Sequence, residues 1–346
     1  MPKTLKEIAL ELNTSVSTVS RVVNNKDNVN EGTRARILKA LKSLDYKPNQ
    51  IARSLKNNST SVIGIIIPDI RERFFCEIIR GVDTIVSEHG YSILLVDSNE
   101  NAKKEEQYLD LLFQQRVDAL IIATVTSGRK VLPYLEHHIP VVFIDNLPKI
   151  DAPYDAILLD NVQASKMAMS LLIGKGHKRI GIIAGTQSET TGFDRLLGYR
   201  LALSEANIEI DEQLITYGNN KEETGYQCME KLILQSQNVP VEAVFSTAEG
   251  MTYGAIKAMR DHHVRFPDDI AIMGFDVHDK SGLITPGITT VRQPEHLNGK
   301  LTAELLLRRL ENLHKEQETR EKIQSSGLET GQRTLLSPYL EIKSSC

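Results

Sequence analysis

Residues 4–23 read TLKEIALELNTSVSTVSRVV, and this stretch decides the fold of the N-terminal part of the chain. Thr4 belongs to the residue types that cap helix N-termini, and apolar side chains at positions 5, 8, 9 and 12 recur at the spacing of one helical face. The polar run at positions 13–15 favours a turn followed by a new helix cap. The stretch therefore predicts two short helices joined by a tight turn.

The second predicted helix, residues 16–23, has a polar outer face. We expect the valines at 16, 19 and 22 or 23 to point inward. The side chains left outside are Ser17, Thr18, Ser20 and Arg21. Short hydroxyl side chains let a helix enter the major groove of DNA closely, and an arginine can form two hydrogen bonds to guanine.

A third helix is predicted over residues 31–44, with Asn30 as its cap. Its apolar residues are expected to complete a small three-helix core, and they are Ile37, Leu38, Leu41 and Leu44.

The charge of the chain is unevenly distributed. Residues 1–60 carry 11 Lys and Arg against 5 Asp and Glu, whereas the remaining residues carry 30 against 40. A basic N-terminal part on an acidic body indicates that only the former meets a polyanion, although an excess of lysine on a solvated face would look the same. The three cysteines have no C-x-x-C spacing, so neither a disulfide framework nor a zinc or other metal site is predicted.

From residue 62 the pattern changes to apolar runs that alternate with amphipathic stretches. The runs VIGIII (62–67), ALII (119–122) and VVFI (141–144) are typical of buried parallel strands. The cycle restarts at RIGIIAG (179–185) and continues through AVFST (243–247) and IAIMGFD (270–276). Two similar doubly wound α/β subdomains are therefore predicted, with ligands expected beyond the carboxyl ends of the strands.

Several strings resemble the lactose repressor (LacI/GalR) family: TLKEIA at 4–9, VSTVSRVVN at 16–24, YKPN at 46–49 and ARSL at 52–55. The resemblance extends in order through the rest of the chain. It implies an α-helical helix-turn-helix head and an α/β body of two parallel-sheet subdomains, similar to periplasmic sugar-binding proteins. The expected domains are 1–48 for the head, 49–60 for a hinge helix and linker, 61–160 with 290–322 for the N-terminal subdomain, and 161–289 with 323–346 for the C-terminal subdomain.

The resemblance also implies a hinge segment that inserts a leucine into the minor groove, where an apolar wedge can kink the duplex. Leu55 occupies the matching position, and the alternative is a linker leucine that packs on Ile51. The residues expected to contact DNA are Thr4, Ser15, Ser17, Thr18, Ser20, Arg21, Asn24, Asn30, Asn49, Ala52, Arg53 and Leu55.

An effector site is expected just after the strands of the body, with Arg195 and Asp276 as the main contacts by resemblance. A carboxylate and a guanidinium suit the hydroxyls of a sugar, and a phenyl ring can stack on its C–H face. The alternatives are a structural ion pair for Arg195 and Asp276 and core packing for the two phenylalanines. The residues expected at the site are Asp69, Arg73, Phe74, Phe75, Asp145, Arg195, Asn220, Ala248, Asp276 and Gln293.

The chain departs from the family at the expected effector site. Glu72 and Arg73 replace the Asn-Pro that often precedes the two phenylalanines, and Ala248-Glu249 replace a frequent Asn-Asp. Arg73 together with Arg195 would suit a sugar acid or sugar phosphate, unless Arg73 pairs with Glu72 in solvent. Residues 315–330 form a longer stretch than the resemblance predicts and are expected to be an exposed insertion.

The predicted function is therefore a homodimeric repressor of operator DNA, controlled by a sugar, sugar acid or sugar phosphate that acts as inducer or corepressor. An alternative main regulator is a phosphorylated carrier protein. No phosphate-binding loop or catalytic triad spacing supports an enzyme, and no cofactor is expected. The N-terminal sequence has no export or membrane signal, which opposes a transport-type binding protein and predicts a cytoplasmic location.

Overall fold

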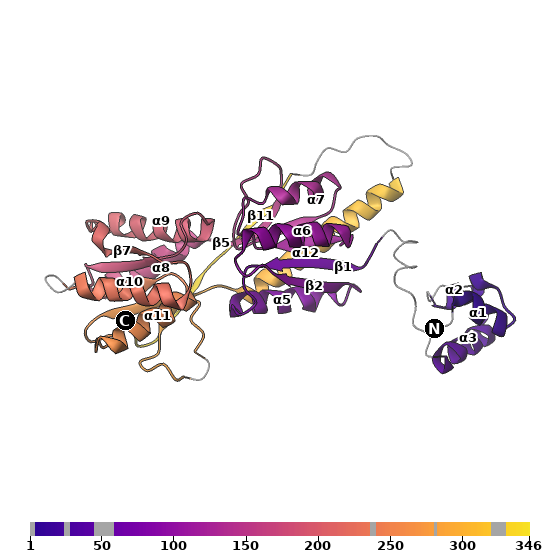
Figure 1. Ribbon diagram of the computed structural model, residues 1–346, viewed down its shortest axis with the longest axis horizontal. Coiled ribbons are helices and arrows are strands. Elements are labelled where there is room, and N and C mark those ends of the chain that lie inside the picture. The colour runs from indigo at the N-terminus through magenta and orange to yellow at the C-terminus, as the bar shows by residue number, and fades with distance from the viewer. Residues whose placement is uncertain (1–3, 24–27, 45–58, 236–239, 280–281, 320–329) are drawn as a thin grey trace. The chain divides into compact units, whose positions relative to one another are not determined.

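The computed structural model describes residues 4–23, 28–44, 59–235, 240–279, 282–319 and 330–346. The chain forms two compact units, residues 1–60 and 61–346, and each is described by itself (Figure 1). The predicted DNA contacts Asn24, Asn49, Ala52, Arg53 and Leu55 lie outside the described residues.

The N-terminal unit contains three helices, α1 (Leu5–Glu11), α2 (Val16–Val23) and α3 (Glu31–Ser43). Thr4 and Glu7 form a reciprocal capping box, in which Glu7 N donates to Thr4 Oγ1 at 3.3 Å and Thr4 N donates to Glu7 Oε2 at 2.6 Å. Asn13 adopts a φ of 47°, a left-handed conformation that Asn tolerates and that ends α1. The predicted pair of helices and the tight turn between them are confirmed.

The core of this unit is built around Ile8, Val19 and Ile37, which are fully buried. Two of the expected core residues are not part of it. Val16 is 45% exposed because it begins α2, whereas the buried valines lie on later turns of that helix. Leu38 is 49% exposed because successive residues of a helix point about 100° apart, so burial of Ile37 turns Leu38 outward.

The body contains two six-stranded sheets, each with helices on both faces. The first sheet has the order β11-β5-β4-β3-β1-β2 and the second β12-β10-β9-β8-β6-β7. Among the described strands all neighbouring pairs are parallel except β10 and β12, which are antiparallel. The doubly wound plan predicted from the sequence is confirmed, and we call the two layered units the first and second lobes.

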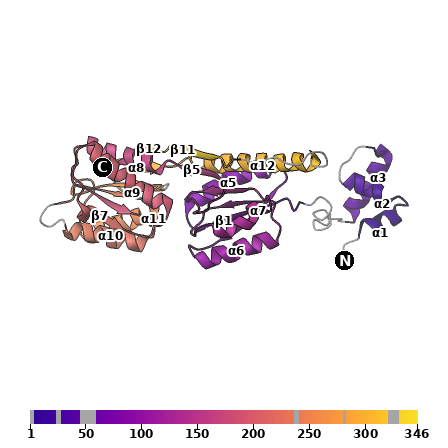
Figure 2. The ribbon, with the colours of Figure 1, turned by 90° about the horizontal axis from the view of Figure 1, so that it is seen from above.

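The first lobe comprises β1 (Val62–Ile67), α5 (Arg73–Val86), β2 (Ser92–Asp97), α6 (Ala102–Gln114), β3 (Ala119–Ile122), η1 (Arg129–Val131), α7 (Leu132–Glu136), β4 (Val141–Ile144), β5 (Asp155–Leu159), α12 (Glu295–Thr319) and β11 (Arg333–Leu336). Helices α5 and α12 cover one face of its sheet and α6 covers the other (Figure 2).

The second lobe comprises α8 (Asn161–Gly174), β6 (Ile180–Ala184), α9 (Thr190–Glu205), η2 (Glu212–Leu214), β7 (Ile215–Tyr217), α10 (Glu222–Gln235), β8 (Ala243–Ser246), α11 (Glu249–Asp261), β9 (Ala271–Phe275), β10 (Thr289–Arg292) and β12 (Tyr339–Glu341). Helices α8 and α9 pack on one face of the sheet, and α10 and α11 pack on the other (Figure 2).

Three segments cross between the lobes, and two of them differ from the expected domain limits. The first crossing follows Leu159, as expected. Strand β10 pairs with β9 and β12 in the second sheet, so the chain returns to the first lobe after Arg292 and not at residue 290. Strand β11 pairs with β5 in the first sheet, so residues 333–336 belong to the first lobe, although residues from 323 onward were expected in the second.

Helix α12 packs closely along α5 in the first lobe. A Cβ on Gly299 would lie 2.0 Å from the carbonyl oxygen of Ile78, and one on Gly81 would lie 2.3 Å from that of His296, so these glycines allow the two backbones to approach. The helix continues to Thr319, and the first part of the expected insertion is therefore helical. Residues 320–329 of that insertion lie outside the described residues.

Candidate effector cavity and DNA-binding face

A cavity of about 570 Å³ lies between the two lobes, where strands of both sheets end. Eight of the ten predicted effector contacts line it: Asp69, Phe74, Asp145, Arg195, Asn220, Ala248, Asp276 and Gln293. The parallel strands explain this result, because their carboxyl ends lie at one edge of each sheet and the two edges face each other.

Asp145 and Asp276 occupy equivalent positions in the two lobes. Asp145 directly follows β4 and has a φ of 62°, and Asp276 directly follows β9 and has a φ of 53°. A left-handed backbone conformation is uncommon for residues other than glycine. Where it occurs, the surrounding structure holds the backbone in place, and such residues cluster at functional sites. In both lobes the conformation places a carboxylate in the cavity wall immediately beyond a strand.

Asp276 is held by Gln293, which lies where the chain crosses back toward the first lobe. Asp276 Oδ2 accepts from Gln293 Nε2 at 2.6 Å and Oδ1 accepts from the Gln293 backbone N–H at 3.1 Å. Burial raises the pKa of Asp276 to about 6, although the bond from Gln293 acts in the opposite direction. The carboxylate therefore links the cavity to a crossing segment.

Arg195 supplies the buried cation of the cavity. It projects from α9, where Nε donates to Asn161 Oδ1 and Nη1 donates to the carbonyl oxygen of Thr247, both at 2.7 Å. Its guanidinium lies 3.7 Å from the ring centroid of Phe275, a cation–π contact. These contacts fix the orientation of the guanidinium before any ligand binds.

Two glutamates that the sequence analysis did not include among the effector contacts also line the cavity. Glu72 and Glu189 lie at the N-caps of α5 and α9, and neither side chain caps its helix. Burial, followed by the nearby charge of Asp145, raises the pKa of Glu72 to about 8 and that of Glu189 to about 7. Burial also raises the pKa of Asp145. One wall of the cavity is thus a group of three carboxyls, which we call the acidic wall.

Lys221 joins the two lobes beside this wall. Its ammonium contacts Asp69 Oδ2 at 3.1 Å and also pairs with Glu100, both in the first lobe. Arg71 donates to both oxygens of Asp69 at 2.8 and 2.6 Å, and these bonds hold the pKa of that carboxyl well below its usual range despite its burial. Lys221 directly follows the predicted Asn220, but nothing in the sequence pattern singled it out.

Phe75 and Arg73 are corrections to the predicted site. Phe75 is 2% exposed and packs in the core under the first sheet, because it lies one position, about 100°, around α5 from Phe74. Arg73 does not line the cavity, and its Nη2 donates to Glu77 Oε1 at 3.3 Å. The alternative, a pairing of Arg73 with Glu72, is absent from the described contacts. Of the two arginines expected at the site, Arg195 lines the cavity and Arg73 does not.

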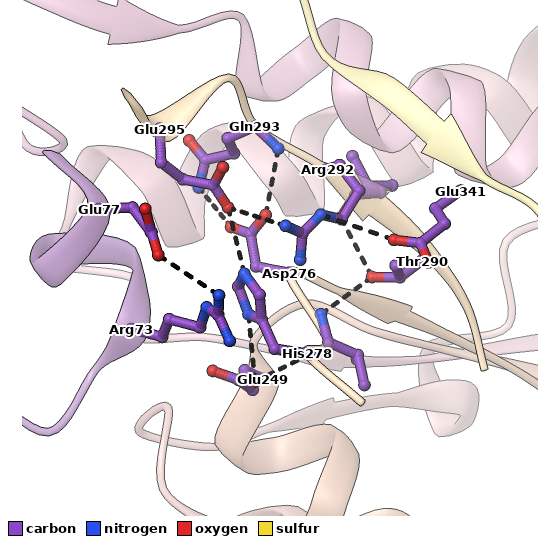
Figure 3. A network of polar contacts seen from close by, with 12 residues as sticks. Arg73, Glu77, Glu249, Asp276, His278, Thr290, Arg292, Gln293, Glu295 and Glu341 are labelled. Atoms are coloured by element: carbon purple, nitrogen blue, oxygen red, sulfur yellow. Dashed lines mark hydrogen bonds and ion pairs between the residues drawn. The ribbon is translucent and has the colours of Figure 1, made fainter. Parts of the chain in front are cut away.

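A polar network runs from the cavity to the crossing segment (Figure 3). Glu249, which lines the cavity, accepts from the backbone N–H of His278 at 2.9 Å and lies 3.3 Å from its ring Nδ1. His278 Nε2 lies 3.4 Å from Glu295, which begins α12 and also pairs with Arg292. Burial alone would lower the pKa of His278, but the two carboxylates outweigh it and raise the pKa to about 9. The ring is therefore a cation that joins the lobes.

In the N-terminal unit the predicted DNA contacts divide into caps and exposed residues. Thr4 and Asn30 cap α1 and α3, and Ser15 Oγ accepts from the backbone N–H of Thr18 at the start of α2. Ser17 and Arg21 are exposed on α2, whereas Thr18 and Ser20 are half-buried. Of the four side chains predicted on the outer face of this helix, two are therefore exposed and two are partly covered. Within the described residues no helix is long and apolar enough to cross a membrane.

Two family models match the chain. Residues 4–49 match "Bacterial regulatory proteins, lacI family", and residues 60–332 match "Periplasmic binding proteins and sugar binding domain of LacI family". The transcriptional regulator RegA of Clostridium saccharobutylicum is 33% identical over 90% of this chain and 93% of its own length. The transcriptional repressor PurR of Proteus mirabilis is 35% identical over 91% and 93%. The solved complex of the transcriptional regulator CelR with cellobiose is 28% identical, with a TM-score of 0.71 over 99% of this chain and 100% of that one.

Proposed function

The chain belongs to the LacI family of DNA-binding transcriptional repressors with an effector-binding body. We propose that a sugar or sugar derivative, bound in the inter-lobe cavity, controls the affinity of the protein for operator DNA. The family consists of transcriptional regulators and not of enzymes. The observation that carries the proposal is that Arg195, on α9, and Asp276, directly after β9, line the same cavity.

The cavity offers the contacts that a polyhydroxylated ring requires. Asp145 and Asp276 are hydrogen-bond acceptors from opposite lobes, Arg195 is an oriented donor, and the ring of Phe74 is available for stacking. A volume of about 570 Å³ is within the range of small-molecule sites. The similarity to the CelR–cellobiose complex supports a carbohydrate ligand.

On the DNA side, we assign major-groove contact to Ser17, Thr18, Ser20 and Arg21, with Ser15, Asn24 and the capping residues Thr4 and Asn30 beside them at the backbone. Residues 49–60 are assigned as the hinge, with Leu55 as the minor-groove wedge and Asn49, Ala52 and Arg53 beside it. A helix with short outer side chains fits the groove, and one such helix covers a half-site. The expected effect of Leu55→Ala is weaker operator binding with unchanged effector binding.

A homodimer is proposed because a two-fold axis matches a palindromic operator. Helix α9 carries an exposed apolar stripe, with Phe193, Leu197 and Leu201 spaced four residues apart and 55%, 37% and 39% exposed. Such a stripe supports burial against a second copy. Sedimentation equilibrium of the full chain tests this, and a monomer at micromolar concentration would contradict it.

The ligand acts by shifting an equilibrium between two arrangements of the lobes. Asp276 is bonded to Gln293, and Glu249 is joined to Glu295 through His278. Ligand contacts in the cavity are therefore connected to the segment that links the lobes. The size of the shift is limited by the differential affinity of the ligand for the two arrangements.

The test is isothermal titration of the full chain with a panel of sugars and sugar derivatives, together with the Asp276→Asn variant. The proposal predicts binding of at least one compound and a loss of roughly tenfold or more in the variant, since a charge-assisted hydrogen bond is removed. If no small molecule binds, the proposed effector site is wrong, and a phosphorylated carrier protein becomes the regulator to examine by pull-down.

A further inference from the structure

The charge of the cavity lining is strongly negative. Eight of the lining residues are Asp or Glu and three are Arg or Lys. The three cations already have protein partners: Arg71 binds Asp69, Lys221 binds Asp69 and Glu100, and Arg195 is bonded to Asn161 and to Thr247. Arg195, whose two partners are neutral, is therefore the lining cation that is not already paired with a carboxylate.

The three carboxyls of the acidic wall, Glu72, Asp145 and Glu189, lack such compensation. Within the described residues no ion pair joins any of them to a cation. They come from three separate strand-to-helix or strand-to-loop junctions in both lobes, so the fold itself gathers them around one space. Ionising all three carboxyls together is therefore costly unless a ligand balances the charge.

We propose that the effector carries a protonated amine on a polyhydroxylated ring, as amino sugars do, and that this amine lies among Glu72, Asp145 and Glu189. The inference rests on the proposed function, because it names the chemistry of the ligand for that same cavity. The ring hydroxyls then contact Asp276 and Arg195, and Phe74 covers the apolar face of the ring.

Lys221 shows how an ammonium fits this environment. Its Nζ approaches Asp69 and pairs with Glu100, and these two carboxylates lie near enough to Glu72 for all three to face one small ion. An amine of the ligand would be a second cation in the same cavity, beside the acidic wall. A sugar phosphate or sugar acid would instead bring a negative charge beside the carboxyls of the acidic wall, with Arg195 but not Arg73 in the cavity lining to offset it.

The acidic wall also predicts that binding of the ligand changes the number of protons bound to the protein. The ionisation of Glu72 is opposed by Asp145, Glu100 and Asp69 and favoured by Lys221, and that of Glu189 is opposed by Asp145 and Glu100 and favoured by Arg195. The pKa of about 8 for Glu72 and about 7 for Glu189 means that near neutral pH Glu72 is mostly protonated and Glu189 is about half protonated. Because a bound ammonium favours the ionised carboxylates, its binding releases protons to the buffer.

The experiment is calorimetric titration of the full chain at neutral pH with glucosamine, galactosamine and mannosamine, each compared with its neutral parent sugar and with glucose 6-phosphate. Titration in two buffers of different ionisation enthalpy counts the protons released. We expect an amino sugar to bind roughly tenfold or more tightly than its parent and to release protons. Glu72→Gln and Glu189→Gln should each remove most of this preference, whereas Glu209→Gln, exposed and outside the cavity lining, should retain it.

Each outcome is decisive. Tighter binding of a neutral sugar or of the phosphate, or an amine preference that survives in the Glu72→Gln, Glu189→Gln double variant, overturns the inference and leaves the sugar-effector function intact. If none of these compounds binds, the amine inference is overturned, whereas the sugar-effector function is decided by the wider panel of sugars and sugar derivatives. Thermal unfolding of each variant, compared with the parent chain, separates a lost contact from a folding defect.

Discussion

Glu72→Gln should stabilise the ligand-free protein, and the gain should grow as the pH rises from about 5 to about 8. Glu72 is half-buried in the acidic wall, and burial raises its pKa from the ordinary 4.5 to about 8. Between these two values the unfolded chain releases the proton while the folded chain retains it. The folded state is therefore progressively disfavoured as the pH rises through this window, and glutamine, which does not titrate, removes the effect.

The expected magnitude follows from the same pKa. The full difference between 4.5 and about 8 would correspond to about 5 kcal/mol, at about 1.4 kcal/mol for each pKa unit. Solvent in the open cavity screens the carboxylate, so we expect about 2 kcal/mol at pH 8. In a body of this size that corresponds to a rise of about 4 °C in Tm.

The assay is urea unfolding of the parent chain, Glu72→Gln and the exposed control Glu209→Gln across that pH range. At the acid end all three proteins should have similar stability. The reasoning is refuted if Glu72→Gln is no more stable relative to the parent at pH 8 than at pH 5, or if Glu209→Gln shows the same pH dependence.

Three further substitutions test the packing and the network. Arg309→Ala should cost about 3 kcal/mol in urea unfolding, because it removes two 2.8 Å bonds that join α12 to buried Asp155, and an unchanged midpoint would contradict this. Gly299→Ala should lower the free energy of unfolding by about 2 kcal/mol, because the new Cβ meets the backbone of α5, whereas Gly174→Ala, where no atom lies within 4 Å, should be neutral or stabilising. His278→Gln should be most destabilising below the ordinary pKa of 6.5 and least so above about 9, because the cationic ring is stabilised only while it is protonated, and a pH-independent loss would count against the ion-pair role.

The sequence predicted the lobes and eight of the residues that line the cavity for a physical reason. Apolar strand runs mark where each strand ends, and the carboxyl ends of parallel strands lie at one edge, so Asp145 and Asp276 could be assigned to this edge from the sequence alone. The choice between Phe74 and Phe75 could not be made in the same way. One position of helical rotation decides which ring faces the cavity, and that rotation is set by the packing of α5 on α12.

The sequence pattern could not predict the acidic wall or the sheets to which strands β10 and β11 belong. Glu72 and Glu189 look like ordinary polar residues at helix starts. The order of strands in the first sheet brings Glu72 near Asp145, and the approach of the second lobe adds Glu189. Strands β10 and β11 each have four residues, which is too short for a hydrophobic pattern to specify the partner sheet. Lys221 could not be predicted either, because its partners lie more than 120 residues away along the chain.

The most direct test of the central claim is the operator affinity of the full chain with and without a compound that occupies the cavity. It is measured by fluorescence anisotropy at fixed salt, on a symmetric operator selected from random DNA. The account predicts that a cavity ligand changes operator affinity by roughly tenfold or more, about 1.4 kcal/mol of coupling, and that Asp276→Asn abolishes the change. Selective operator binding that no cavity ligand alters would contradict it.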